Sequence, residues 1–320
     1  MKAVGIVTEY NPFHNGHIYH IQQAKKETGA DVVVAVMSGN FVQRGEPALF
    51  DKWTRAQAAL ENGVDLVIEL PIFYAVQPSH LFAEGAVKLL AALGVKDMVF
   101  GSEHADVDFL SLAKQAPSVS QGKDLQDKNQ TFASAYAHLL EAETGFKLED
   151  PNDILALGYA KAVVDLSADI KLHAIQRVAA GYHDTLFSDT QTIASASAIR
   201  LALHKNKLEK IQSVVPDITL QNVQSMNNTI NFEQKFLPLL KYRLITDTVG
   251  QLSQIYQMGE GLEHRLAAVA LSEPGPQNYQ NFIKSVKSKR YTFARMQRTL
   301  LYTLLNVKVD QMQSAMQEPY

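Results

Sequence analysis

In the first half of this 320-residue chain, short apolar runs of strand length alternate with stretches of helical periodicity. Five runs have the composition of buried strands: 3–7, 32–37, 66–68, 98–100 and 170–174. The helical patterns between them cover 17–28, 54–62, 80–93 and 152–166. Because strands that alternate with helices build parallel sheets, we predict an α/β fold with a Rossmann-like, doubly wound parallel sheet. A ligand then sits beyond the carboxyl ends of the strands.

The stretch that follows the first expected strand carries the strongest chemical pattern, His14-Asn15-Gly16-His17 at the start of a helix. Gly16 lets backbone approach a phosphate without a Cβ, and a helix N-terminus offers free N–H groups to an anion. Two imidazoles three residues apart share a helical face and can donate to charge that grows on phosphate. The alternative is a loop with two ordinary surface histidines.

A second pattern follows the fifth expected strand, where Ser195, Ser197 and Arg200 open a short helix. Hydroxyl groups, helix-start amides and a guanidinium together can hold phosphate groups. The alternative is a serine-capped helix without a ligand.

The pattern changes after about residue 208, where polar segments precede helical runs at 232–244 and 263–271. We therefore predict two parts, a nucleotide-binding domain over 1–205 and a mostly helical region over 206–320. Within the latter, 276–308 holds seven basic residues and no Asp or Glu, although the whole chain has a net charge of −3. With Phe282, Tyr291 and Phe293 interleaved, this segment is typical of an RNA contact surface. The alternative is a solvated amphipathic helix whose aromatic residues lie in the core.

Composition excludes several classes of protein. A chain with 46% hydrophobic residues and nearly balanced charge is neither a disordered tail nor a uniformly basic coat. The lack of cysteine removes disulfides, thiol nucleophiles, iron–sulfur clusters and Cys-rich zinc sites. The N-terminal apolar stretch is too short for a secretory signal and no run has membrane-spanning length, so we expect a cytoplasmic protein without a membrane partner.

Both patterns resemble those of the nucleotidyltransferase superfamily, whose members bind ATP and break its α,β-phosphate linkage. The first matches its His-x-Gly-His signature, and 193–200 looks like its Ser-Ser-Thr-x-x-Arg-type phosphate loop. Ala198 departs from the family pattern, which often has a basic residue there. A closer resemblance, to the bacterial tRNA(Met) cytidine acetate ligase family, rests on 4–17, 38–47, 100–103 and 289–292 and spans nearly the whole chain.

The resemblance implies a two-step reaction. Acetate is activated with ATP to acetyl-adenylate, and the acetyl group then passes to N4 of the wobble cytidine in elongator tRNA(Met). It implies ATP as the nucleotide, and acetate and tRNA as partners. Because the first step is a phosphoryl-type transfer, Mg²⁺ is a candidate ion on the phosphates, and we expect no metal-ligating residues in the protein. Two alternatives remain: a small-molecule adenylyltransferase of the same superfamily, and a non-catalytic RNA-binding protein.

The expected site residues follow from the patterns and the resemblance. His14 and His17 are the expected catalytic residues. The ATP contacts are expected at Val7, Thr8, Glu9, Tyr10, Asn11, Pro12, Phe13, His14, Asn15, Gly16, His17, Ile18, Tyr19, His20, Gly101, Asn152, Arg177, Ser195, Ser197 and Arg200. The tRNA contacts are expected at Lys284, Lys287, Lys289, Arg290, Arg295 and Arg298. Trp53, the single tryptophan, is predicted to be a packing residue.

Overall fold

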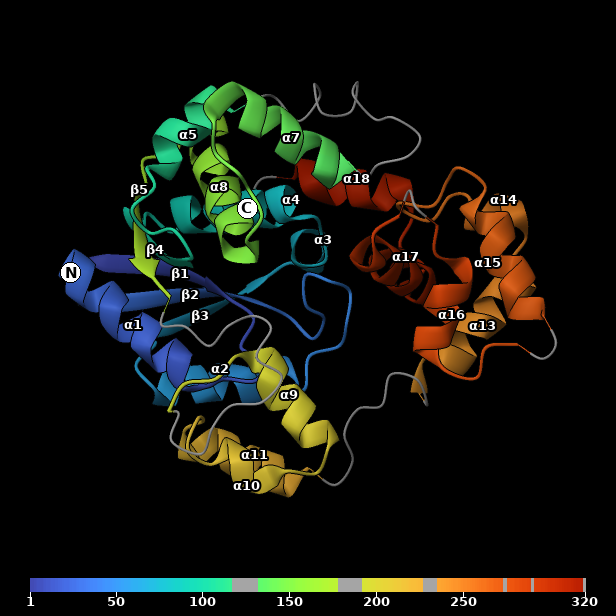
Figure 1. Cartoon of the computed structure of the whole chain (residues 1–320), viewed down its shortest axis with the longest axis horizontal. Helices are drawn as coiled ribbons and strands as arrows, with labels where there is room; N and C mark the ends of the chain where they lie inside the picture. Colours follow the sequence, from blue (N-terminus) through green and yellow to red (C-terminus); the bar gives the residue numbers. More distant parts are fainter. Residues whose placement is uncertain (117–131, 178–191, 227–234, 273–274, 289–290, 319–320) are drawn as a thin grey trace.

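The computed structural model of the chain describes residues 1–116, 132–177, 192–226, 235–272, 275–288 and 291–318 (Figure 1). The expected tRNA contacts Lys289 and Arg290 lie outside the described residues, and nothing further is said of their structure.

A single sheet of five parallel strands forms the centre of the N-terminal part, in the order β3-β2-β1-β4-β5. Its strands are β1 (Ala3–Thr8), β2 (Val32–Ser38), β3 (Leu66–Leu70), β4 (Asp97–Ser102) and β5 (Lys171–Gln176). The central strand β1 pairs with β2 through Val4 opposite Val33 and with β4 through Val4 opposite Asp97. The predicted doubly wound parallel sheet is therefore confirmed, and all five predicted strands are present.

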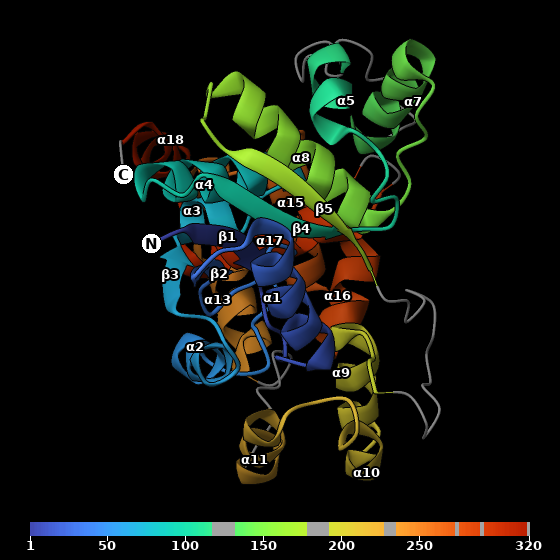
Figure 2. The same cartoon turned by 90° about the vertical axis from the view of Figure 1, so that its left-hand side faces the viewer.

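Helices cover both faces of this sheet (Figures 1 and 2). One face carries α1 (Asn15–Thr28) and α2 (Lys52–Glu61), and the other carries α3 (Ile72–Ala75), α4 (Ser79–Ala92) and α8 (Pro151–Asp165), with α5 (Phe109–Gln115) and α7 (Phe132–Thr144) beyond α8. Alternate residues of a strand point to opposite faces, so Val33 and Ala35 join the core under α1, whereas Val34 and Val36 join the core under α4. The four helices predicted in this half are present.

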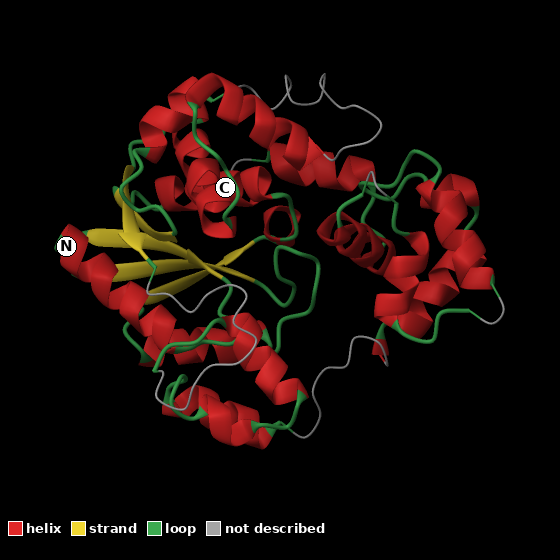
Figure 3. Ribbon diagram, viewed as in Figure 1, coloured by secondary structure: helices red, strands yellow, loops and turns green. Residues whose placement is uncertain are grey.

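Eight of the other described helices form two further groups (Figure 3). The first group, α9 (Ala196–His204), α10 (Leu208–Ile211) and α11 (Asp217–Ser225), shares a small apolar core. The second comprises α13 (Leu237–Thr246), α14 (Val249–Leu252), α15 (Leu262–Leu271), α16 (Tyr279–Val286) and α17 (Phe293–Leu305) around another core. Thus α10 and α11, which follow the predicted boundary at 205, pack with α9, which precedes it. The two-domain division remains a prediction.

The last helices return to the N-terminal part of the chain. On α17, Tyr302 donates from its hydroxyl group to the carbonyl of Val76, and Gln297 donates to Glu46 Oε1 at 2.6 Å. The final helix α18 (Val309–Gln317) packs against α3, where the Tyr74 hydroxyl donates to the Met316 carbonyl at 3.0 Å. The last two helices and residues 46–76 therefore stabilise one another through buried and part-buried contacts.

The expectation that Trp53 is a packing residue is wrong, because its side chain is 74% exposed. Helix α2 buries Arg55, Ala58 and Ala59, which lie on one helical face, and Trp53 falls outside that face. Arg55 is 1% exposed and donates to the carbonyls of Phe50, Glu9 and Gly39. Burial lowers the pKa of Arg55 to about 10, so this charge stays in place at neutral pH. It ties the loops that leave β1 and β2 to α2.

Candidate active site

The two expected catalytic histidines meet at the start of α1. His14 is the N-cap, and its Nδ1 accepts a hydrogen bond from the Gly16 N–H at 3.1 Å. His17 Nδ1 accepts from the His14 N–H at 3.2 Å, and the two rings stack with centroids 3.7 Å apart. Because both Nδ1 atoms accept, each neutral ring carries its proton on Nε2. The helix start therefore presents two Nε2–H donors.

The surroundings keep these imidazoles neutral. Tyr10 and Phe13 are buried beside them, and the ring of Tyr10 packs edge-on against His17 at 4.8 Å. Burial lowers the pKa of His14 to about 3, with Arg177 and Arg200 adding to the effect. Burial, with His14, His20 and Arg177 nearby, also lowers the pKa of His17. Neutral donors at this position can stabilise phosphate charge without a change of protonation.

His20 lies one turn further along α1 and, like His14 and His17, is half-buried. Its Nε2 donates to the Val99 carbonyl at 3.2 Å, and burial lowers its pKa to about 4. The ring therefore joins α1 to β4 instead of offering a charge to a ligand.

The depressed pKa of His14 predicts acid sensitivity. Between its unfolded value near 6.5 and its folded value of about 3, the unfolded chain binds a proton that the folded chain does not, so stability present at neutral pH is lost as the pH falls. In His14→Asn the amide can still cap α1, but it does not titrate. From about pH 6 to about pH 5, we expect the parent to lose about 1 kcal/mol more than this variant in urea unfolding.

His104, whose raised pKa acts in the opposite direction, is common to both proteins and does not affect the difference. Equal losses of stability in the two proteins would mean that His14 is protonated as easily in the folded chain as in the unfolded one.

Gly16 leaves room for the His14 ring. A Cβ at this position would lie 2.9 Å from His14 Cε1 and 3.0 Å from its Nδ1. The sequence analysis attributes the glycine to the approach of phosphate, and the structure adds that it lets the capping imidazole fold over the helix start.

We therefore expect Gly16→Ala to displace the His14 ring and to weaken ATP binding by about tenfold, the loss of roughly one hydrogen bond to a charged group. Gly250→Ala in α14 is the matched control, because nothing lies within 4 Å of a Cβ there. Calorimetric titration with ATP measures both variants. Parent-like affinity in Gly16→Ala would show that the ring position does not matter for the nucleotide.

The second sequence pattern lies beside the first. Ser195 caps α9, its Oγ accepting from the Ala198 N–H at 3.2 Å, and Arg200 donates to the Asn11 carbonyl at 2.6 Å and to Ser197 Oγ at 3.3 Å. The Asn15 side chain donates to the carbonyls of Thr192 and Ser213 at 2.9 and 3.0 Å. The structure thus brings both patterns together, although about 180 residues separate them in sequence.

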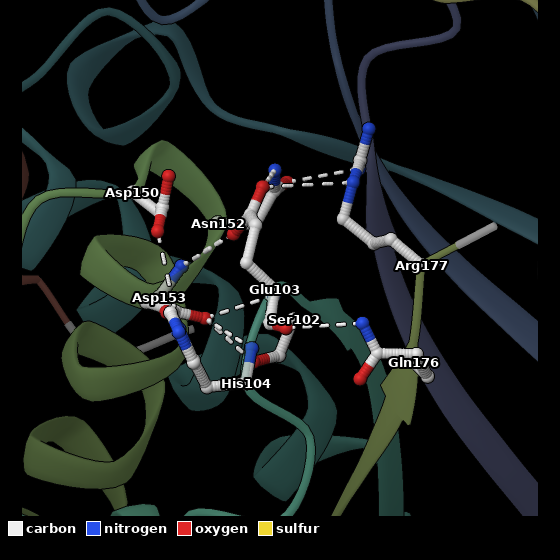
Figure 4. Close-up of polar contacts among 8 residues, drawn as sticks. All are labelled: Ser102, Glu103, His104, Asp150, Asn152, Asp153, Gln176 and Arg177. Carbon is white, nitrogen blue, oxygen red and sulfur yellow. Dashed lines mark hydrogen bonds and ion pairs between the residues drawn. The ribbon is translucent and has the colours of Figure 1, made fainter. Parts of the chain in front are cut away.

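Three further expected ATP contacts come from β4, α8 and the end of β5: Gly101 lies in β4, Asn152 in the first turn of α8, and Arg177 directly after β5. Figure 4 shows Asn152 and Arg177 side by side. Arg177 donates from a terminal guanidinium nitrogen to Asn152 Oδ1 at 3.1 Å. A Cβ at Gly101 would lie 3.2 Å from Arg177 Cγ, so the glycine leaves room for the arginine stem. Arg177 is close enough to lower the pKa of His14 and His17. The ends of β4 and β5 therefore border the same site as the two histidines.

The other residues of the first loop are mostly buried and support its shape. The end of β1 contains Val7 and Thr8, and the loop from β1 to α1 contains Asn11 and Pro12. Asn11 Oδ1 accepts a hydrogen bond from the Leu49 N–H at 2.7 Å. Burial raises the pKa of Glu9, whose carboxylate accepts from the Gln43 N–H at 2.8 Å. Ile18 and Tyr19 are half-buried on α1.

A carboxylate cluster lies beside the site without the character of a metal centre. Ligand atoms of His104, Asp150 and Asp153 lie within 4.8 Å of one another. Asp153 already accepts from Ser102 Oγ at 2.6 Å and from the Glu103 N–H at 3.0 Å, and it pairs with His104 Nδ1 at 2.5 Å. Burial opposes its ionisation, but the bonds from Ser102 and His104 hold the pKa of Asp153 below its usual range. The cluster fastens α8 to β4.

The basic segment divides into exposed and buried parts. Lys284 on α16 and Lys287 just after it are exposed, and the Arg295 guanidinium lies over the Tyr291 ring at 4.6 Å. Arg298 is 8% exposed, so its guanidinium is largely withdrawn from solvent. Phe282 and Tyr291 are buried, as expected if the segment is an amphipathic helix whose aromatic residues lie in the core. Of the described residues in this set, Lys284, Lys287 and Arg295 offer accessible charge.

Three features together define a nucleotidyltransferase. They are the parallel sheet, the paired imidazoles at the start of the first helix, and the serine–arginine loop beside them. Over residues 1–320 the chain matches the family described as HIGH Nucleotidyl Transferase, and it belongs to that family. Its relatives narrow the assignment to the tRNA(Met) cytidine acetate ligase family, which confirms the resemblance found in the sequence.

Two such relatives are the tRNA(Met) cytidine acetate ligases of Leuconostoc citreum and Leuconostoc mesenteroides. They are 80% and 72% identical over 320 residues, which is all of this chain and 81% and 82% of theirs. Among solved structures, Thermotoga maritima TmcAL bound with alpha-thio ATP matches with a TM-score of 0.84 and 34% identity, over 99% of this chain and 78% of that one. Its apo form gives a TM-score of 0.87 over all of this chain.

Proposed function

We propose that the chain is an ATP-dependent ligase that activates acetate as acetyl-adenylate and transfers the acetyl group to N4 of the wobble cytidine of elongator tRNA(Met), with release of AMP and pyrophosphate. The observation that carries the proposal is the pair of neutral Nε2–H donors at His14 and His17, bordered by Arg177 and Arg200. The names of the relatives and the ATP analogue bound to TmcAL support it.

In the first step, an acetate oxygen attacks the α-phosphorus of ATP. An oxygen–phosphorus bond forms, the α,β-phosphate bond breaks, and pyrophosphate leaves. The His14 and His17 donors and the N-terminus of α1 stabilise charge that grows on the α-phosphate. Arg200, with the hydroxyls of Ser195 and Ser197, lies where it can neutralise the leaving pyrophosphate, and Arg177 approaches from β5. Positioning and charge neutralisation are sufficient for such a step.

In the second step, the cytidine N4 amine attacks the acyl carbon. A carbon–nitrogen bond forms, the bond to the AMP oxygen breaks, and N4 loses a proton. Acetate lacks a good leaving group, whereas acetyl-adenylate can release AMP. The N4 amine requires such an activated acyl group, because its lone pair is delocalised into the base ring. The route requires no covalent enzyme intermediate and suits a chain without cysteine.

We propose that Mg²⁺ enters with the nucleotide on its phosphate oxygens. Mg²⁺ commonly binds through substrate phosphates with few protein ligands. The cluster of His104, Asp150 and Asp153 does not fit as its site, because hydrogen bonds already engage both oxygens of Asp153.

We further propose that the helical region over 206–320 contacts tRNA through its basic segment, and that the reaction takes place in the cytoplasm, where its tRNA substrate is found. In the described part of the chain, no helix is long and apolar enough to cross a membrane.

The proposal is tested by mass spectrometry of nucleosides from tRNA incubated with the protein, ATP and isotope-labelled acetate. We expect labelled N4-acetylcytidine, dependent on ATP. Pyrophosphate exchange that needs no acetate would instead favour a small-molecule adenylyltransferase. Absence of ATP binding would favour a non-catalytic RNA-binding protein.

A further inference from the structure

We propose that Glu103 is a positioning residue that holds Asn152 and Arg177 in the orientation in which they meet ATP. The inference rests on the proposed function and on the expectation that Asn152 and Arg177 contact ATP. Glu103 follows β4, Asn152 lies in the first turn of α8, and Arg177 follows β5 (Figure 4). From the end of β4, one carboxylate therefore reaches two other segments of the site edge, the start of α8 and the end of β5.

The Glu103 carboxylate contacts a different group in each direction. Its Oε1 accepts from Asn152 Nδ2 at 2.5 Å and lies 3.7 Å from Arg177 Nε. Its Oε2 accepts from the Asp153 N–H at 3.2 Å, in the first turn of α8. A carboxylate is stabilised near a helix N-terminus. The Glu103 side chain is 25% exposed and the Arg177 side chain is 42% exposed. The carboxylate is therefore less accessible to solvent than the guanidinium that it holds.

The backbone of Glu103 is fixed on both sides. Its N–H donates to Asp153 Oδ1 at 3.0 Å, and its carbonyl accepts from Gln176 Nε2 at 3.0 Å. Because the Asp153 N–H in turn donates to the Glu103 carboxylate, the end of β4 and the start of α8 are joined reciprocally. The carboxylate is thus held before any ligand arrives, which reduces the entropy lost on binding.

This arrangement determines which way the Asn152 amide faces. Since Nδ2 donates to Glu103, Oδ1 is turned toward Arg177 and accepts its hydrogen bond at 3.1 Å. Without the carboxylate, the amide can rotate and present its own N–H groups to the guanidinium, where two donors face each other. Glu103 therefore orients Arg177 both directly and through Asn152, and Arg177 is near enough to influence His14 and His17.

The test compares Glu103→Gln and Glu103→Ala with the parent in acetate-dependent pyrophosphate exchange. Glutamine keeps one acceptor but loses the charge, whereas alanine loses both. We expect the KM for ATP to rise about tenfold in Glu103→Gln and further in Glu103→Ala, with kcat changed by less than about threefold. Glu61→Gln is the matched control, because Glu61 is an exposed glutamate on α2 and the same charge is removed there.

A double-mutant cycle with Arg177→Ala tests whether Glu103 influences ATP binding through Arg177. If Glu103 acts through Arg177, Glu103→Gln has little further effect once Arg177 is alanine, so the two changes are not additive. Thermal melting of each variant separates a lost fold from a lost orientation. If Glu103→Ala melts early, Glu103→Gln alone decides the question.

The outcomes separate this inference from the proposed function. An active parent whose affinity for ATP falls in Arg177→Ala but not in either Glu103 variant overturns the positioning role. Tighter ATP binding in Glu103→Gln also overturns it, because the carboxylate would then oppose the nucleotide. A parent without any acetate-dependent exchange overturns the proposed function itself, whatever Glu103 does.

Discussion

Replacing His17 with alanine is expected to reduce acetate-dependent pyrophosphate exchange by about a hundredfold or more. The substitution removes one of the two Nε2–H donors that we propose for stabilising phosphate charge. It also removes the acceptor of the His14 N–H and the ring on which His14 stacks at 3.7 Å, so the second donor loses its support. Initial-rate exchange with labelled pyrophosphate measures the loss.

Two further variants make this result specific. In His17→Gln, a glutamine at the third helical position can still accept from the N-cap backbone, so the helix start is preserved while the imidazole is lost. His204→Ala removes an exposed histidine from the end of α9 and should behave like the parent. Near-normal exchange in His17→Ala would remove His17 from the catalytic assignment.

Replacing Lys284, Lys287 and Arg295 together with alanine is expected to abolish acetyl transfer to tRNA while leaving acetate-dependent pyrophosphate exchange nearly intact. These side chains are the expected tRNA contacts whose charge is accessible among the described residues, and the ATP motifs lie on other elements. Each lost phosphate contact should also make log Kd less dependent on log salt, by about 0.7 to 0.9. Filter binding at several salt concentrations and both half-reactions provide the measurements.

The matched control replaces Lys26, Lys96 and Lys171, which are exposed but lie in the last turn of α1 and at the amino ends of β4 and β5. Their replacement removes the same charge from the opposite edge of the sheet. If the first triple variant binds tRNA with the parent's affinity and salt dependence, the basic segment is only a solvated surface.

Local patterns in the sequence were sufficient to predict the parallel sheet and the position of the histidine motif at a helix start. Runs such as 32–37 are apolar because their strand is buried on both faces, and His14 to His17 carry their chemistry within one helical turn. The roles of Arg55 and Glu103 depend instead on contacts with segments 46 and 49 residues away, which no local pattern shows. The sequence also could not distinguish buried Arg298 from accessible Arg295, since both carry the same charge on one helix.

The return of α17 and α18 to the N-terminal part affects how the chain folds as it leaves the ribosome. The contacts of Tyr302 with Val76 and of Tyr74 with Met316 join residues 226 and 242 positions apart. During synthesis, the parallel sheet can assemble first, but the apolar surface around α3 stays uncovered until α17 and α18 have emerged. Such distant contacts slow folding, so the nascent protein passes through a long interval in which a chaperone can bind that surface.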